Sequence, residues 1–333
     1  MHKHEYKVMS TYPEVIGLGE VLIDFIASEP VHYTEASTFI KCFGGAPMNT
    51  IVGVARLGVN AGAIAVVGED PFGEYIISEF KKNNVDTSHV IMRRGKRTTL
   101  AFVINEPVTG ERTFFFYRKP WAGETADSTL TPKDIDHKYI SKSKILHVSG
   151  FTLSQNPSRK AALEAIKSAK KQGVKISFDP TLRSDVWNSE LTIRKMYNSV
   201  LRIADIATFS MEEAEFIFKT SKPKEAAERV LEYGVGIVGV KLGSKGALIR
   251  SKDGIEVFAP AYKVNVIDTT GAGDGWNAGL LVGLIKGLGL EDCVKIANAV
   301  GAFVVTKRGA ITALPFKEEL NNFLKDHSVS LRI

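Results

Sequence analysis

The stretch "DTTGAGDGWNAG" at residues 268–279 places two aspartates and two threonines around a glycine-rich turn. A β-branched run at 264–267 precedes it, and an apolar segment typical of a helix follows from about Trp276. A glycine-rich turn that enters a helix presents unpaired backbone N–H groups, and the helix dipole adds positive potential there. The stretch therefore predicts a phosphate site at the mouth of a helix.

Within this stretch, the small residues Gly271, Ala272 and Gly273 leave their amides unobstructed. Helix capping would explain one acid in the first turn. It does not explain why Asp268 and two threonines come before such an open turn. An anion hole with a general base explains both features, because the amides would stabilise a transferring phosphoryl group while Asp274 accepts a hydroxyl proton.

The composition is that of a globular protein: 333 residues, 44% hydrophobic and 24% charged. No run approaches the roughly 20 apolar residues that a membrane span needs. The first residues, "MHKHEYKVMSTYPEV", contain no apolar core of signal-peptide length. We therefore expect a cytoplasmic protein with no membrane partner.

The net charge of +6 does not indicate nucleic-acid binding, because basic and acidic residues are interleaved. The densest basic stretch, "MRRGKR" at 92–97, lacks interleaved aromatic residues and is typical of a solvated turn. The two cysteines, Cys42 and Cys293, suit a reducing compartment as buried thiols. We expect no nucleic-acid partner.

Apolar β-rich runs alternate with amphipathic stretches along nearly the whole chain, which predicts an α/β fold with a doubly wound, mostly parallel sheet. One domain is expected over 1–333, because no linker or repeat interrupts the pattern. Helix 70–84 has Asp70 as its expected N-cap and Pro71 at its first position. Further strands are expected at 61–68, 144–150, 174–180, 204–210 and 237–243, and further helices at 46–58, 157–172, 190–203, 211–219 and 223–234.

Residues 97–118 break this alternation, with two β-rich runs around the turn "NEPVTGE". This pattern predicts a hairpin, and residues 31–45 are interpreted as a second one. We expect the segments 31–43 and 97–118 to form a small sheet that acts as a lid or as a dimer surface.

The first glycine cluster, "GLGEVL" at 17–22, has Leu22 where a dinucleotide fingerprint needs glycine at the start of a helix. Asp24 follows in what is interpreted as a strand. In "FGGAPMN" at 43–49, two glycines permit close backbone approach, and Asn49 offers both a donor and an acceptor. These residues suit sugar hydroxyls, although a flexible helix start would have the same pattern.

The motif "DTTGAGD" resembles the C-terminal signature of the ribokinase-like (PfkB) carbohydrate kinases, D-T-x-G-A-G-D. The resemblance runs from "GLGEVLIDF" to "KRGAITALP" and includes "GGAPMN", "DPTLR" at 179–183 and "VKLGSKGA" at 240–247. It implies a ribokinase-like three-layer sandwich with a β-sheet lid, ATP as phosphoryl donor, Mg²⁺, and a homodimer formed through the lid.

The resemblance also implies roles for individual residues. Asp274 would be the base, Gly271, Ala272 and Gly273 the anion hole, and Arg183 a contact to the transferring phosphate. Asp24, Gly44, Gly45 and Asn49 would hold the sugar, while Lys241, Gly243, Gly246 and Asn298 would line the nucleotide side. Glu213 would position magnesium indirectly, and Asp268, Thr270 and the 305–313 loop would surround a monovalent cation such as K⁺.

Three positions depart from the family pattern. The N-x-x-E motif appears as "SMEE" at 210–213, so Ser210 replaces asparagine while Glu213 keeps its place. Ile51 stands where alanine is usual, and Trp276 where phenylalanine is common. None of these changes removes a charge that the mechanism needs.

The acceptor sugar is the least determined feature. "FFFYRKPWAGETAD" at 114–127 resembles the fructokinase branch, and Arg112 or Arg118 would reach a substrate from the lid unless both are surface residues. An arginine would equally suit the sugar acid 2-keto-3-deoxygluconate. Fructokinase is the prediction; the alternatives are 2-keto-3-deoxygluconate kinase, another PfkB sugar kinase, and a sugar-binding sensor without activity.

Overall fold

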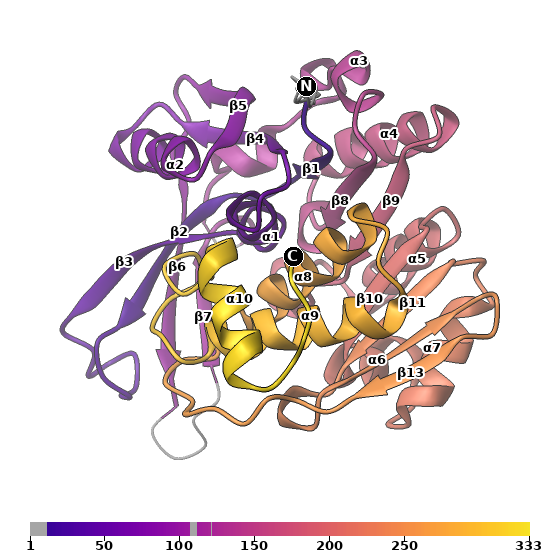
Figure 1. Cartoon of the computed structure of the whole chain (residues 1–333). Helices are drawn as coiled ribbons and strands as arrows, with labels where there is room; N and C mark the ends of the chain where they lie inside the picture. The colour runs from indigo at the N-terminus through magenta and orange to yellow at the C-terminus, as the bar shows by residue number, and fades with distance from the viewer. Residues whose placement is uncertain (1–11, 107–111, 121) are drawn as a thin grey trace, which may run out of the picture.

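The computed structural model describes residues 12–106, 112–120 and 122–333, which form two β-sheets and the helices around them (Figure 1). The larger sheet has nine strands in the order β13-β12-β11-β10-β9-β8-β1-β4-β5, and only the β11–β12 and β12–β13 pairs are antiparallel. The smaller sheet has the order β3-β2-β6-β7. The strands are β1 Val15–Leu18, β2 Leu22–Ala27, β3 Phe39–Gly44, β4 Ala61–Gly68, β5 Val85–Arg93, β6 Thr99–Asn105, β7 Arg112–Tyr117, β8 Ile145–Ser149, β9 Lys175–Asp179, β10 Ile206–Ser210, β11 Ile237–Lys241, β12 Ala247–Ser251 and β13 Glu256–Ala259.

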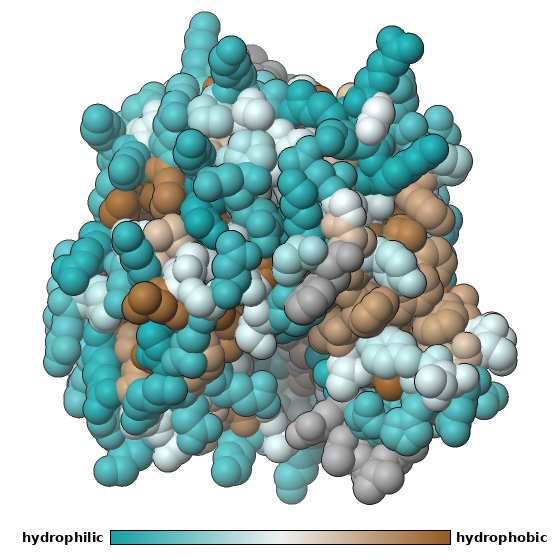
Figure 2. Space-filling model, turned by 180° about the vertical axis from the view of Figure 1, so that it is seen from behind, coloured by the Kyte–Doolittle hydropathy of each residue, from teal (hydrophilic) through white to brown (hydrophobic). Residues whose placement is uncertain are grey.

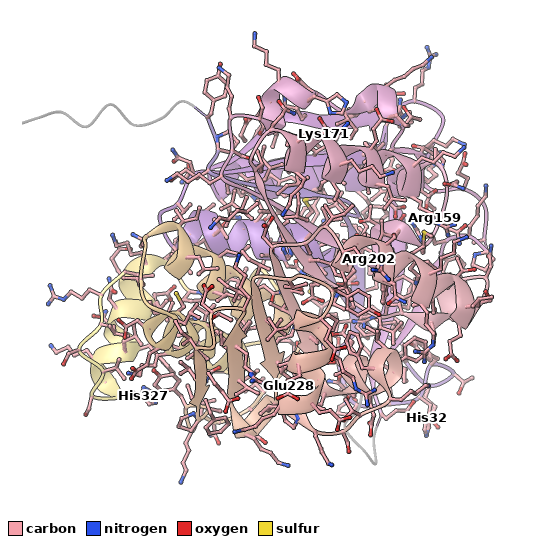
Figure 3. All side chains as sticks on the ribbon, turned by 90° about the vertical axis from the view of Figure 1, so that its right-hand side faces the viewer. His32, Arg159, Lys171, Arg202, Glu228 and His327 are labelled. Atoms are coloured by element: carbon pink, nitrogen blue, oxygen red, sulfur yellow. The ribbon has the colours of Figure 1, made fainter. Side chains whose placement is uncertain are left out.

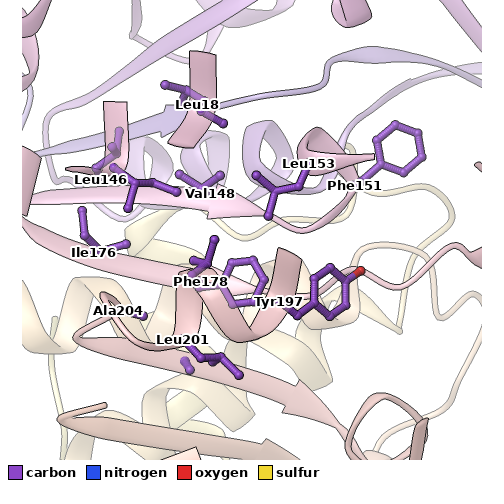
Figure 4. Packing of buried hydrophobic residues seen from close by; sticks show 14 of the residues in the cluster. Leu18, Leu146, Val148, Phe151, Leu153, Ile176, Phe178, Tyr197, Leu201 and Ala204 are labelled. Atoms are coloured by element: carbon purple, nitrogen blue, oxygen red, sulfur yellow. The ribbon is translucent and has the colours of Figure 1, made fainter. Parts of the chain in front are cut away.

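Helices cover both faces of the nine-stranded sheet, which gives three layers and confirms the α/β sandwich (Figure 1). The helices are α1 Ala46–Arg56, α2 Pro71–Lys82, α3 His137–Ile140, α4 Ser158–Lys171, α5 Glu190–Leu201, α6 Met211–Phe218, α7 Pro223–Leu231, α8 Ala272–Ile285, α9 Leu290–Val304 and α10 Lys317–Asp326. Two extensive apolar clusters hold the layers together, one on each face. Figure 4 shows one of them, in which Phe178 of β9 and Val148 of β8 lie near Tyr197 of α5.

Local sequence signals set many of the boundaries. The Asp70 carboxylate accepts hydrogen bonds from the N–H groups of Phe72 and Gly73, and Pro71 occupies the first helical position of α2, as expected. Strand β4 spans the expected residues 61–68, and the other expected strands and helices are found within a few residues of their predicted ends.

The larger sheet places the ends of its parallel strands along one edge. β1 lies between β4 and β8, so the chain moves to one side of β1 first and to the other side later. In open α/β sheets, ligands bind at the carboxyl ends of the strands beside such a switch point. Four neighbouring strands end there in polar residues, namely Ser149, Asp179, Ser210 and Lys241.

The smaller sheet, called the lid sheet here after the role predicted for it, confirms one expected hairpin and corrects another. β6 and β7 form the expected hairpin, with Leu100 opposite Tyr117, and most of its turn (107–111) lies outside the described residues. The hairpin expected at 31–45 is wrong, because only Phe39–Gly44 is a strand and its partner is β2. The chain therefore leaves the large sheet after Leu18 and enters the lid at Leu22.

Among the described residues, no helix is both long and apolar enough to cross a bilayer. In Figure 3 the basic side chains Arg159, Lys171 and Arg202 lie apart from one another along the side formed by α4 and α5. Cys42 and Cys293 are free and buried, as expected.

Candidate active site

The glycine-rich turn enters α8 as expected, although the helix begins at Ala272 rather than near Trp276. Gly271 is the N-cap, with φ +75°. A Cβ at this position would lie 2.8 Å from Ala310 Cβ, so both backbone conformation and close packing require glycine. The turn can therefore come close to a ligand. The first N–H groups of α8 have no partner within the helix, although the Ala272 N–H donates to the Thr269 carbonyl at 3.3 Å.

Asp274 lies in the first turn of α8 and faces the first helix of the chain. Asn49 Nδ2 on α1 donates to Asp274 Oδ2 at 2.8 Å, and Thr50 Oγ1 donates to the Asp274 carbonyl at 3.2 Å. Burial raises the pKa of Asp274 to about 6, and the Asn49 hydrogen bond opposes that rise. The carboxylate is thus held in place and poised to exchange a proton near neutral pH.

Asp24 lies in the middle of β2, opposite Cys42 of β3 and Ala101 of β6. Gly44 leaves room for it, because a Cβ there would lie 2.3 Å from Asp24 Oδ2. Burial raises the pKa of Asp24 to about 7, while the guanidinium groups of Arg183 and Arg112 act in the opposite direction. The lid therefore carries a second buried carboxyl group into the neighbourhood of Asp274, whose charge further raises the pKa of Asp24.

Two arginines from different parts of the fold meet on one aromatic ring. The Arg183 guanidinium lies 4.3 Å from the centre of the Phe114 ring, and that of Arg112 lies 5.9 Å from it. Arg183 follows the loop after β9, whereas Arg112 and Phe114 belong to the lid strand β7. Burial lowers the pKa of Arg112, and the carboxylates of Asp268, Asp274 and Asp24 counteract this. The structure thus brings both arginines towards the carboxylates.

Arg118 lies in a different environment from Arg112. Its side chain is 0% exposed, its Nε donates to Asp127 Oδ2 at 2.9 Å, and its Nη1 donates to Ser154 Oγ at 2.8 Å. The alternative that Arg118 is a surface lid residue is therefore wrong. Its Nη2 has no hydrogen-bond partner among the described residues, so a role toward the sugar stays a prediction.

Lys241, expected on the nucleotide side, lies beside the first turn of α8. Its Nζ would be 3.4 Å from a Cβ at Gly273, and it forms a 2.6 Å ion pair with Asp179 Oδ2. The sequence reasoning did not single out Asp179 as a site residue. The sequence feature that could have identified it is its position directly before Pro180, at the end of an apolar strand, where ligands bind in α/β folds.

The loop that carries Arg183 is fixed to this cluster. Thr181 has a φ of +40°, an uncommon value for a residue other than glycine, and its N–H donates to Asp179 Oδ1 at 2.9 Å. Leu182 N–H donates to Glu213 Oε1 at 3.0 Å. The strained backbone around Thr181 is thus hydrogen-bonded to the carboxylates of Asp179 and Glu213.

Ser210 performs the capping role that its position requires. Its hydroxyl accepts the N–H of Glu213 at 3.2 Å, and Glu213 Oε2 accepts the N–H of Ser210 at 2.8 Å. Within the described ranges, no group of three or more His, Cys, Asp or Glu side chains could hold a metal ion. This donor set fits magnesium only where substrate phosphates and water supply most of its ligands, which is its usual mode of binding.

Asp268 organises the loop before the helix. Its Oδ1 accepts both the N–H and the hydroxyl of Thr270, at 2.9 and 2.6 Å, and its Oδ2 accepts the N–H of Gly309 at 2.8 Å. A cavity of about 80 Å³, lined by Asp268, Arg308 and Asn105 among others, lies between this loop and the lid. The carboxylate braces the loop, and its surroundings are compatible with a cation bound mainly by oxygens.

Two of the remaining residues predicted for the nucleotide side, Gly246 and Asn298, lie beside residues 259–260. Asn298 Nδ2 donates to the carbonyls of Ala259 and Pro260 at 3.0 and 3.1 Å, and its Oδ1 accepts Trp276 Nε1 at 2.8 Å. A Cβ at Gly246 would lie 2.1 Å from Ala259 O, whereas Gly243 faces open space. Asn298 therefore braces this segment, and Trp276 is a buried packing residue, as interpreted.

Comparisons with known proteins identify the family to which the chain belongs. A family model described as pfkB family carbohydrate kinase matches residues 13–317. The chain is 38% identical over 324 residues to "Probable fructokinase-6, chloroplastic" of Arabidopsis thaliana, covering 94% of this chain and 82% of that protein. Among solved structures, a fructokinase double mutant from Vibrio cholerae O395, with fructose, ADP and potassium ion bound, is 33% identical with a TM-score of 0.82, covering 94% and 99% of the two chains. A putative ribokinase II from E. coli, in complex with ATP and Mg²⁺, is 29% identical with a TM-score of 0.85, covering 95% and 100%.

Proposed function

Because this chain belongs to the pfkB family of carbohydrate kinases and is an ATP-dependent phosphotransferase, we propose that its acceptor is D-fructose. The products are fructose 6-phosphate and ADP. The observation that carries the catalytic part is the buried Asp274 carboxylate at the N-terminus of α8, hydrogen-bonded to Asn49. The similarity to fructokinases over more than nine tenths of the chain supports the choice of sugar.

In the proposed mechanism, Asp274 orients the sugar hydroxyl and accepts its proton. The hydroxyl oxygen forms a bond to the terminal phosphorus of ATP, and the bond from that phosphorus to the bridging oxygen breaks, which releases ADP. The Gly271, Ala272 and Gly273 amides and Arg183 stabilise the charge on the transferring group. Asp24, Gly44, Gly45, Asn49 and Arg112 hold the sugar under the lid, which excludes water.

The proposed cofactors follow from the same residues. Bound magnesium would neutralise charge on the ATP phosphates, and Glu213 would take part through the surrounding water and loop 181–183. Asp268 and Thr270 would contribute to a site for K⁺, the ion that the related fructokinase structure contains. The nucleotide base would lie beside Gly243, Gly246 and the segment that Asn298 braces.

A second acceptor, 2-keto-3-deoxygluconate, is favoured by one feature. Arg112 and Arg183 both lie on Phe114 and both act on Asp24, and two guanidinium groups suit a carboxylate. A coupled ADP-release assay with fructose, 2-keto-3-deoxygluconate, ribose and tagatose phosphate decides between them. The highest kcat/KM is expected with fructose, and a higher value for the sugar acid would replace fructose as the acceptor.

The base assignment is tested by Asp274→Asn, which keeps the size of the side chain but removes its basicity. We expect kcat to fall by about 10²–10⁴-fold, the usual contribution of a general base. ATP and sugar affinity, measured by calorimetry, should change little. Asp292→Asn is the matched control, since it removes an acid from the first turn of α9. Near-normal turnover of Asp274→Asn would rule out this residue as the base.

A further inference from the structure

Phe114 of the lid sheet lies against Arg183 of the body, the name used here for the nine-stranded sheet with its helices and loops. The guanidinium carbon of Arg183 lies over the Phe114 ring, 4.3 Å from its centre, which is within the range of a cation–π contact. Phe114 belongs to β7, whereas Arg183 follows the loop after β9. The contact therefore joins lid and body at the site, and it depends on where the lid lies.

The backbone that carries Arg183 is fixed more firmly than its side chain. Hydrogen bonds to the carboxylates of Asp179 and Glu213 hold the loop 181–183. The guanidinium donates from Nη1 to the Leu182 carbonyl at 2.8 Å, but such a group has five N–H donors. This one bond leaves most of the donors unused, so the ring of Phe114 contributes much of what orients the group.

An aromatic ring can orient this arginine without competing with an anion. A cation–π contact needs no acceptor oxygen, so it does not occupy the N–H donors of the guanidinium. A carboxylate in the place of the ring would accept two of these donors and compensate the charge. With Phe114 as its partner, Arg183 keeps both its donors and its charge for phosphoryl oxygens.

A row of aromatic rings keeps Phe114 in place. β7 is the last strand of the lid sheet, and its side chains alternate between the two faces. On the inner face, the rings of Phe114 and Phe116 stack at 5.9 Å with their planes 8° apart, and the Phe116 ring lies 5.3 Å from that of Phe151. Phe151 begins the short 3₁₀ helix Phe151–Leu153 after β8. The row thus ends on the body, and the position of Phe114 reports how the lid is seated there.

The charge of Arg183 acts on the carboxyl groups of the site. It lowers the pKa of Asp24 and of Asp274, against the larger effect of burial. Arg112 of the lid lies 5.9 Å from the same ring, and the charge of Arg183 adds to the burial that lowers the Arg112 pKa. The two guanidinium groups repel each other, and their shared contact with Phe114 opposes this repulsion.

We propose that Phe114 is a positioning residue, which aligns the Arg183 guanidinium with the transferring phosphoryl group while the lid lies over the acceptor. This inference rests on the proposed role of Arg183 toward the phosphate. Phosphoryl transfer depends largely on alignment and on stabilisation of charge, so an arginine that is not aligned slows it. With the lid displaced, transfer to water is slowed as well, which limits the hydrolysis of ATP without a sugar.

The first test is Phe114→Leu, which keeps the residue apolar and removes the ring. With the best acceptor of the four-compound panel, we expect kcat to fall by about 5- to 30-fold, the equivalent of one desolvated cation–π contact. The KM for that acceptor should stay within about twofold of the wild-type value. Phe114→Tyr, which retains a ring, should keep at least about half of the wild-type kcat.

Phe115→Leu is the matched control, because Phe115 is the same residue type in the same strand but lies on the outer face of the lid sheet. Its kcat should equal that of the wild type. A near-normal kcat in Phe114→Leu would overturn the proposal. A raised KM with an unchanged kcat would also overturn it, because the ring would then contact the sugar rather than align the arginine.

A double-mutant cycle separates alignment of Arg183 from a structural role of the ring. Arg183→Met removes the guanidinium, and in that background Phe114→Leu should change kcat by less than about twofold, because no guanidinium is left to align. The same 5- to 30-fold loss in both backgrounds would show that the ring acts independently of Arg183, and would contradict the proposal.

The cycle also distinguishes failure of this inference from failure of the proposed site. If Arg183→Met loses activity while Phe114→Leu is normal, only the inference about Phe114 is wrong. If Arg183→Met itself has near-normal kcat, the proposed role of Arg183 is wrong and the inference fails with it. The assignment of the base is tested independently by Asp274→Asn.

Discussion

At the scale of single residues, Asp24 and Asp274 show how burial adapts carboxylates to proton exchange near neutral pH. Burial raises the pKa of Asp24 to about 7 and that of Asp274 to about 6. Asp24 packs against Gly44, where a Cβ would lie 2.3 Å from its Oδ2, and Asp274 accepts a hydrogen bond from Asn49. The charged forms cost folding free energy, and buried carboxylates with such raised pKa values are more frequent at functional sites than elsewhere.

This cost predicts a pH-dependent stability change in Asp24→Asn. The folded pKa of Asp24 lies above that of the free side chain, so its stabilising contribution is complete below about pH 4 and is lost as pH rises through 7. The stability gain from asparagine should therefore grow between pH 4 and 7 and then level off. A gain of order 1–3 kcal/mol is expected at pH 8, since one pKa unit corresponds to about 1.4 kcal/mol.

Urea unfolding of the wild type and Asp24→Asn at pH 5 and pH 8 measures this difference. Asp253→Asn, in the exposed turn between β12 and β13, is the control, and its effect should be the same at both pH values. A gain at pH 8 no larger than that at pH 5 would contradict the assignment of the raised pKa to Asp24.

At the scale of elements, the two ends of α8 require glycine for different reasons. Gly271 at the start and Gly287 just after the end both have positive φ, at +75° and +72°. A Cβ at Gly271 would lie 2.8 Å from Ala310 Cβ, whereas nothing lies within 4 Å of one at Gly287. Only the start of the helix combines the backbone requirement with a close approach.

Alanine at these two positions separates the cost of the backbone conformation from the cost of the close contact with Ala310. Gly287→Ala should cost about 1 kcal/mol, the usual penalty for alanine in the left-handed conformation. Gly271→Ala should cost clearly more, by about 1–3 kcal/mol, because Ala310 and its loop must also move. Thermal or urea unfolding of both variants measures the difference. Equal losses of unfolding free energy in the two variants would mean that the 309–313 loop moves away from the new Cβ at no measurable cost.

At the scale of the whole molecule, the outer face of the lid sheet is apolar and open. The alternation of β7 turns Arg112 and Phe114 inward and leaves Phe115 and Tyr117 53% and 52% exposed. Figure 2 shows apolar side chains gathered over this part of the molecule. Stacked and edge-to-face aromatic pairs extend the same face to Phe25, Phe39 and Phe102. Such a surface is typical of a contact with another protein.

We therefore expect a homodimer formed through this outer lid face. The double substitution Phe115→Lys and Tyr117→Lys should shift the protein from dimer to monomer, because desolvating two charges at the centre of an apolar interface is costly. Analytical ultracentrifugation measures the shift. Leu191→Lys, which changes an isolated exposed side chain on α5, should not alter the mass. A wild-type protein that is monomeric at all concentrations would contradict the expectation.

The alternation of strands and helices could be predicted from the sequence, because period, caps and turns are local signals. Asp70 and Pro71 at the start of α2, and glycine at the start of α8, are readable within a few residues. The "DTTGAGD" motif likewise predicts an anion site, since a helix N-terminus and its acid are neighbours in sequence.

Only the tertiary structure decided which side chains meet. The Asn49–Asp274 hydrogen bond joins residues 225 positions apart, and the Lys241–Asp179 pair joins residues 62 apart. The alternation of β7 turned Arg112 inward on the same side as Phe114, while Arg118, one residue past the strand, became buried against Asp127. Local patterns fix the backbone period, but the partner of a charged side chain depends on strand order and register, which are set by packing over the whole chain.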